Sequence, residues 1–155
     1  MKERDQGEMI ASFESELGTE ITLPEGSRLE EAITDDRRRV ILYEGGILFF
    51  ESDGMMIPSL RALLDDFVSL PEVTVDMGAI RFVANGADIM RPGITAVDDD
   101  VRKGALVAIV DERHGKPLAV GLATMDAEDI RSSEKGKAIL SKHHVGDEIW
   151  EFGKD

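Results

Sequence analysis

The twenty residues from Val75 to Ile94 constrain the fold more than any other part of the chain, because three elements and two turns follow one another without spare residues. Asp76 is placed to cap a short helix with its carboxylate. Asn85-Gly86 supplies a left-handed helix stop, and Arg91-Pro92-Gly93 ends the next extended segment in a turn. The segment therefore predicts a strand end, one helix and a return strand. The apolar residues at helical spacing are Met77, Ile80, Val83 and Ala84.

The first seventy residues carry their own signals, which predict a small mixed α/β unit. TEITLP, residues 19–24, is typical of a short strand. Ser27 and Glu30 have the capping-box spacing, so we expect a short helix after them. Residues 39–43 and 47–51 are apolar, β-branched or aromatic, and the glycines between them predict a hairpin.

A second helix is predicted after Pro58, where Ser59 is placed to cap it. Leu70-Pro71 would end this helix, since the residue before a proline avoids the helical region. Its apolar stripe comprises Leu60, Leu63, Leu64, Phe67 and Val68. We therefore place a domain boundary at residue 71, giving an N-terminal domain over 1–71 and a second domain over 72–155.

The second domain contains two predicted strands, residues 105–110 and 118–123, with a turn at His114-Gly115-Lys116. Leu106 to Val110 is apolar without alternation, which indicates burial on both faces, as in a small closed barrel. The fold class expected for the whole chain is α+β.

Several motifs in this half carry a resemblance to a known family. Residues 86–94, GADIMRPGI, resemble the helix-to-strand return of the PUA domain, a small RNA-binding module named after pseudouridine synthases and archaeosine transglycosylases. VRKGALVAIVDERHGKPLAVGLATMDAEDI resembles its central strand pair, and EKGKAILSKHHVGDEIWEF its closing strand. VDMGAIRFV, MDAEDI and the ending DEIW look most like archaeal relatives of the malignant T-cell-amplified sequence protein and ligatin, which are translation factors. The resemblance implies a PUA-type β-barrel (a pseudo-barrel with short helices) over 72–155.

The resemblance also implies an RNA-binding groove, with one wall formed by the helix and the segment after it. The candidates on this wall are Arg81, Gly86, Ala87, Asp88, Met90 and Arg91, of which Arg81 and Arg91 are the expected phosphate partners. Lys135, Gly136 and Lys137 are candidates for the opposite wall, with Lys142, His143 and His144 as possible further donors. The alternative for the glycines is a helix stop and a turn, and the alternative for the cationic side chains is plain solvation.

Composition limits the other chemistries. The chain has no cysteine, which excludes disulfides, thiolate nucleophiles and thiolate metal sites. No GxSxG, P-loop, GxGxxG or HExxH motif occurs, so we expect no catalytic residues and no cofactor. Asp98-Asp99-Asp100 lacks further ligands at EF-hand spacing, so no metal is expected. The charged start, MKERDQGEMI, is unlike a signal peptide, and we expect a cytoplasmic protein without a membrane role.

The net charge of −14 bears directly on an RNA-binding role, because phosphate neutralisation by Lys and Arg supplies most non-specific affinity. Residues 1–71 carry 7 basic and 16 acidic side chains, whereas residues 72–155 carry 11 and 16. By resemblance we expect a protein that recognises structured RNA, the acceptor end of tRNA or ribosomal RNA, in translation at the small ribosomal subunit. The alternative, which the charge favours, is an adaptor that binds a basic ribosomal or RNA-modification protein.

Overall fold

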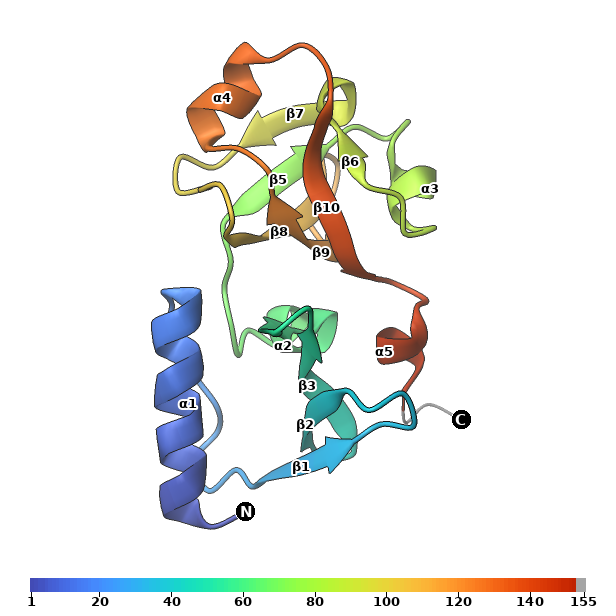
Figure 1. The fold of residues 1–155 in the computed structure, drawn as a ribbon. Coiled ribbons are helices and arrows are strands. Elements are labelled where there is room, and N and C mark those ends of the chain that lie inside the picture. Colours follow the sequence, from blue (N-terminus) through green and yellow to red (C-terminus); the bar gives the residue numbers. More distant parts are fainter. Residues whose placement is uncertain (153–155) are drawn as a thin grey trace. The chain divides into compact units, whose positions relative to one another are not determined.

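The computed structural model describes residues 1–152 and divides into two compact units (Figure 1). The first comprises residues 1–69 together with the described residues from Glu148 onward, and the second comprises Leu70–Asp147. The predicted ranges 1–71 and 72–155 differ from these units at the C-terminus, where α5 (Glu148–Glu151) contacts β3 of the first unit. Within the described residues, no helix has the length and apolar character needed to cross a membrane.

The first unit is built on a four-stranded antiparallel sheet in the order β1-β2-β3-β4. Its strands are β1 (Leu29–Ile33), β2 (Arg39–Tyr43), β3 (Gly46–Ser52) and β4 (Met55–Pro58). The predicted hairpin is confirmed as β2 and β3, which pair antiparallel. Besides α5, the helices described in this unit are α1 (Glu3–Leu17) and α2 (Leu60–Leu64), and α2 lies against β3 and β4.

Two predictions for the segment after α1 are wrong. The capping-box helix after Ser27 is instead strand β1, which pairs with β2 from Leu29 opposite Tyr43 to Ile33 opposite Arg39. The ladder along β2 and the burial of Leu29 outweigh a local capping signal, because tertiary pairing overrides propensity. The strand predicted over 19–24 is reduced to a single bridge between Ile21 and Val68.

The helix α1 was not predicted, although its signal is present in the sequence. Met9, Ile10, Phe13 and Leu17 recur at helical spacing, and Gly18 follows with a φ of 71°. Phe13 is buried, and its ring centre lies 5.1 Å from that of Phe49 in β3.

Ser59 caps α2 as predicted, since its side chain accepts a hydrogen bond from the Ala62 N–H. The helix ends at Leu64, earlier than expected. Asp66 has a φ of 60°, and the Phe67 and Val68 N–H groups both donate to the Ala62 carbonyl, which closes the helix.

The second unit is a nearly closed β-barrel formed by a six-stranded sheet in the order β6-β10-β9-β8-β5-β7 (Figure 1). The strands are β5 (Glu72–Val75), β6 (Ile89–Met90), β7 (Ile94–Val97), β8 (Leu106–Asp111), β9 (Pro117–Ala123) and β10 (Lys137–His144). β6 and β7 are the two edges of this sheet, and a single 3₁₀ turn, η1 (Arg91–Gly93), connects them. The sheet therefore curls back on itself, and its helices are α3 (Ile80–Val83) and α4 (Ala127–Ser132).

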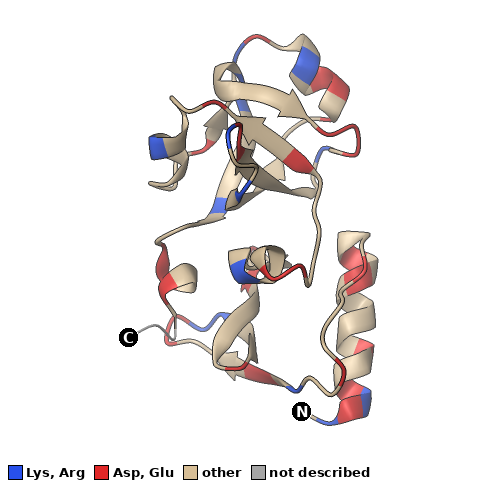
Figure 2. Cartoon of the chain, turned by 180° about the vertical axis from the view of Figure 1, so that it is seen from behind, with Lys and Arg blue, Asp and Glu red and all other residues tan. Residues whose placement is uncertain are grey.

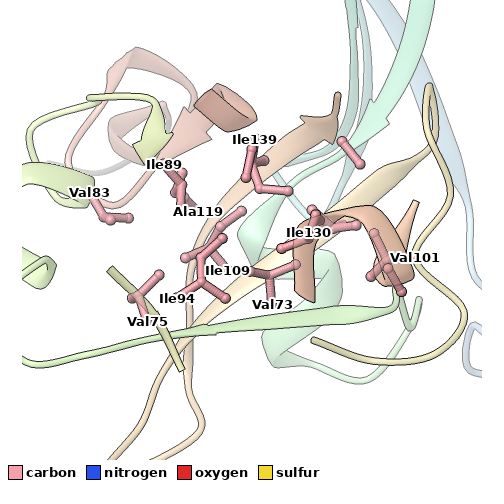
Figure 3. Close-up of a cluster of buried hydrophobic side chains, with 14 residues drawn as sticks. Val73, Val75, Val83, Ile89, Ile94, Val101, Ile109, Ala119, Ile130 and Ile139 are labelled. Carbon is pink, nitrogen blue, oxygen red and sulfur yellow. The ribbon is translucent and has the colours of Figure 1, made fainter. Parts of the chain in front are cut away.

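The barrel encloses one apolar core (Figure 3). Every residue of β8 is buried, which confirms that this strand is covered on both faces. Gly121 in β9 allows close packing, because a Cβ there would lie 2.4 Å from the Ile139 side chain and 2.7 Å from the Leu140 carbonyl oxygen. Further core residues are Val73, Val75, Val83, Ile89, Ile94, Val101, Ile109, Ala119 and Ile130.

Candidate functional site

The site begins at the turn between β5 and α3, where Asp76 fixes the backbone. Asp76 Oδ1 accepts a hydrogen bond from the Ala79 N–H at 2.9 Å within the turn before α3, whose N-cap is Ala79 and not Asp76 as predicted. The Asp76 N–H donates to the Gly93 carbonyl at 2.9 Å, which joins the turn to η1. Because α3 starts only at Ile80, Met77 lies outside the helix and is 39% exposed instead of packed in an apolar stripe.

An open groove of about 570 Å³ follows this turn. Its walls come from the β5–α3 turn, α3, β6 and η1, and its lining residues are Asp76, Gly78, Ala79, Phe82, Val83, Ala87, Asp88, Ile89, Met90, Pro92 and Gly93. Two of its large apolar side chains remain in solvent, Phe82 at 54% and Met90 at 47% exposure. Large exposed apolar groups around a groove are typical of a binding surface.

Phe82 is the site residue that sequence reasoning missed. Phe82 does not belong to the apolar stripe of the predicted helix, so that pattern gives it a solvent-facing position. An aromatic residue at a solvent-facing helix position is the signal that could have indicated a binding role, and Phe82 is indeed exposed. The guanidinium carbon of Arg81 lies 4.8 Å from the centre of the Phe82 ring, which is cation–π geometry. Arg81, a predicted phosphate partner, therefore contacts an exposed aromatic side chain that lines the groove.

Lys137 and Asp88 form the contact between the groove and β10. Lys137 Nζ lies 3.2 Å from Asp88 Oδ2, while Asp88 Oδ1 accepts the Ser141 N–H at 2.8 Å. The Lys137 side chain is still 60% exposed, so its ammonium keeps hydrogen-bond donors in solvent. Lys137 also pairs with Met90 across the β6–β10 ladder. The structure thus brings three predicted residues, Asp88, Met90 and Lys137, to one edge of the groove.

Arg91 has structural partners of its own. Its Nε donates to the Ile130 carbonyl at the end of the barrel core, and its Nη1 donates to the Ile94 carbonyl at 3.1 Å. The Arg91 backbone N–H donates to the Gly136 carbonyl at 2.8 Å. Arg91 and Gly136 therefore hold η1 against the turn before β10, on which Lys135 is exposed. A phosphate contact by Arg91 stays a prediction.

Gly86 lies in the turn after α3, which ends at Val83, and its φ of 87° is the left-handed conformation predicted for it. It also contacts β10, because a Cβ at this position would lie 2.8 Å from His144 Nε2. Ala87 follows it and lines the groove. Of the two adjacent histidines, His143 is 1% exposed with Nδ1 at 2.8 Å from Asp147 Oδ2, so His143 belongs to the interior.

The acidic run at residues 98–100 has contacts that fix the chain near β5. Asp98 Oδ2 accepts the Glu72 N–H at 2.8 Å, and Asp99 pairs with Arg131 of α4. Partial burial, and secondarily the charge of Asp98, raise the pKa of the Glu72 carboxyl. Over residues 1–152, no group of three or more His, Cys, Asp or Glu side chains is arranged to hold a metal ion.

Comparison with known proteins places these features in a family. The PUA domain model matches residues 71–145. An uncharacterized protein of Methanocaldococcus jannaschii is 42% identical over 84% of this chain and 80% of its own length. Translation machinery-associated protein 20 of Saccharomyces cerevisiae is 37% identical over 84% of this chain and 75% of its own length. Malignant T-cell-amplified sequence 1 of Rattus norvegicus is 38% identical over 72% of this chain and 63% of its own length.

Solved structures agree with the sequence relatives. A conserved PUA domain protein from Thermoplasma acidophilum superposes with a TM-score of 0.80 and 32% identity, covering 96% of this chain and 94% of that one. A chain of an H/ACA RNP bound to a substrate RNA matches 61% of this chain and 28% of its own length, with a TM-score of 0.50 and 27% identity. The chain therefore belongs to the family of PUA-domain proteins that includes translation machinery-associated protein 20 and malignant T-cell-amplified sequence 1.

Proposed function

We propose that this protein binds structured RNA through the groove beside α3 and β6, and that it acts in translation at the small ribosomal subunit. Two findings on related proteins support the proposal. Its relative in yeast is named as associated with the translation machinery, and a structural relative is part of a ribonucleoprotein bound to RNA. The proposed activity is binding without catalysis.

The observation that carries the proposal is the exposed pair of Phe82 and Arg81 at the groove. An aromatic ring that is 54% exposed gives an unpaired base a flat surface to stack on, and each such stack contributes about 1–3 kcal/mol. Arg81 lies close enough to that ring for its guanidinium to reach the adjoining phosphate. Lys137, whose side chain is 60% exposed and whose ammonium pairs with Asp88, provides a second cation at the edge of the groove.

The stacking surface favours RNA with unpaired bases, because bases inside a duplex have no free face. Sequence-specific and shape-specific RNA recognition by proteins is directed mainly at such loops, bulges and ends. The unpaired acceptor end of tRNA meets this requirement, and a ribosomal RNA helix meets it where bases are bulged out. The acceptor end is therefore the first ligand to test.

The experiment compares deacylated tRNA, the same tRNA without its unpaired 3′ nucleotides, and a ribosomal RNA helix across a KCl series. The double variant Arg81→Gln, Lys137→Gln tests the groove, and Arg4→Gln on the exposed face of α1 is the control, with a side chain that is 88% exposed. Arg91 is left unchanged because its guanidinium holds two backbone carbonyls. We expect saturable, salt-sensitive binding that the double variant loses and the control retains. Absence of binding to all three RNAs at low salt would refute the proposal.

A second candidate function, an adaptor that binds a basic protein, is favoured by the charge of the first unit. The helix α1 carries Glu3, Asp5, Glu8, Glu14 and Glu16 against Arg4, and Figure 2 shows acidic positions recurring along it. An acidic surface steers cationic partners and repels RNA. Binding to a basic ribosomal protein, unaffected by the groove variant and weakened by charge loss on α1, would support this function instead.

A further inference from the structure

We propose that the tip of the β8–β9 hairpin, residues 112–116, is a second contact with the RNA backbone, which it holds through Arg113, His114 and Lys116. This proposal rests on the proposed RNA-binding function of the groove. It assigns a role to an exposed basic turn that belongs to neither wall of that groove.

The turn is fixed in shape by its acidic residue at the base. Asp111 is only 5% exposed, and its carboxylate accepts the His114 N–H, while the Gly115 N–H donates to the Asp111 carbonyl at 3.0 Å. Hydrogen bonding from the His114 N–H, with further backbone donors of the turn, lowers the pKa of the Asp111 carboxyl. The Asp111 carboxylate is therefore buried at the base of the turn, while Arg113, His114 and Lys116 are exposed, as is Glu112.

The tip lies beside the turn that leads into the groove. β5 and β8 run parallel, with Val75 opposite Asp111, so the segments that follow these two strands leave the sheet at the same end. The Glu112 N–H donates to the Val75 carbonyl at 3.0 Å, and Glu112 Oε1 accepts the Met77 N–H at 3.1 Å. Asp76 and Gly78, on either side of Met77, line the groove. Glu112 thus links the basic tip to the rim of the groove, and one oxygen of its exposed carboxylate accepts a hydrogen bond from that backbone.

This arrangement suits a phosphodiester chain that leaves the groove. Arg113 has the planar fork that matches phosphate oxygens, Lys116 adds a point charge, and His114 adds ring donors. Contacts of this type fix the position of a nucleic acid without reading its bases. With the tip, the protein therefore holds the nucleotides in the groove and also the nucleotides that follow them on the RNA strand.

The test measures tRNA binding by the double variant Arg113→Gln, Lys116→Gln over a KCl series. Two single variants, matched as a test and a control, are measured in the same way. Lys116→Gln is compared with Lys103→Gln, since Lys103 is exposed before the opposite end of β8, where its N–H donates to Asp126 Oδ1. A phosphate contact contributes about 1 to the slope of log K against log salt concentration, so the double variant lowers that slope by about 1–2. Lys103→Gln should leave the slope as in the wild type.

A short oligonucleotide of the unpaired 3′ end provides a further comparison. If the tip contacts the strand beyond the groove, the double variant weakens tRNA binding and leaves oligonucleotide binding unchanged. The tip proposal is overturned, and the groove function stands, if the wild type binds tRNA and the double variant does so with the same affinity and slope. It is also overturned if Lys103→Gln lowers the slope as much as Lys116→Gln, because the effect is then one of overall charge. If the wild type binds no RNA, the groove function and the tip proposal fail together.

Discussion

Truncation of Phe82 to alanine separates RNA binding from folding. The ring is 54% exposed, so its loss leaves no buried cavity, and exposed substitutions usually change the free energy of unfolding by about 0.5 kcal/mol or less. A base stacked on the ring contributes about 1–3 kcal/mol, which corresponds to a loss of roughly 5- to 140-fold in affinity. We therefore expect Phe82→Ala to weaken RNA binding strongly with little change in stability.

The assay is a pair of titrations, one of RNA binding and one of urea unfolding, on the same protein samples. Phe82→Tyr keeps an aromatic ring and should bind as the wild type does, whereas Phe82→Leu keeps apolar bulk without a ring and should behave like Phe82→Ala. Phe152, which is 42% exposed in the first unit, offers a matched control, since Phe152→Ala removes an exposed aromatic side chain that does not line the groove.

Three results would refute the stacking argument. Wild-type affinity in Phe82→Ala would show that the ring contributes nothing to binding. Equal loss of affinity in Phe82→Ala and Phe152→Ala would show a non-specific effect of removing exposed aromatic surface. Retained affinity in Phe82→Leu would assign the contribution to apolar contact instead of to stacking.

Two further predictions concern the folded state. Gly86→Ala should lower the free energy of unfolding by at least about 1–2 kcal/mol, since Gly86 has a φ of 87° and the new Cβ would lie 2.8 Å from His144 Nε2; urea titration measures the loss, and an unchanged midpoint would contradict it. Asp111 has a lowered pKa when folded, so the stability it contributes is present above its unfolded pKa of about 4 and is lost as the pH falls through the folded value. Melting temperatures of wild type and Asp111→Asn should therefore differ at neutral pH and converge in acid, and a constant difference would count against this.

The elements that could be predicted are those whose local signals agree with their tertiary surroundings. β8 was expected to be buried on both faces because it lacks alternation, and the strand is fully buried. Ser59 caps α2 and Gly86 has the left-handed φ that their residue types favour, while Asp76 accepts a hydrogen bond in the turn just before α3. In each case the side chain acts on backbone only a few residues away, so the sequence neighbourhood contains both partners.

What the sequence could not predict depends on a distant partner. Residues 29–33 have a helix-start signal, yet pairing with β2 and burial of Leu29 make them a strand. Lys137 was expected near the groove, but its link to Asp88, 49 positions away, depends on the closure of the barrel. The expected phosphate contact of Arg91 stays a prediction, but the carbonyls of Ile94 and Ile130, which accept hydrogen bonds from its guanidinium, could not be foreseen. Contacts between strands that are distant in sequence produce no local sequence pattern from which they could be predicted.

The acidic composition fits RNA binding if affinity comes mainly from stacking and shape. The groove and the hairpin tip together offer four exposed or largely exposed cations: Arg81, Lys137, Arg113 and Lys116. Each phosphate contact adds about 0.7–0.9 to the salt slope, so a fully engaged site has a slope of roughly 3–4 in magnitude. Since the net charge of −14 repels RNA elsewhere, duplex RNA without unpaired bases gains no stacking and meets repulsion. We therefore expect binding to depend on a ligand that has both an unpaired base for Phe82 and a backbone within reach of these cations, because the surface around this small basic site is acidic.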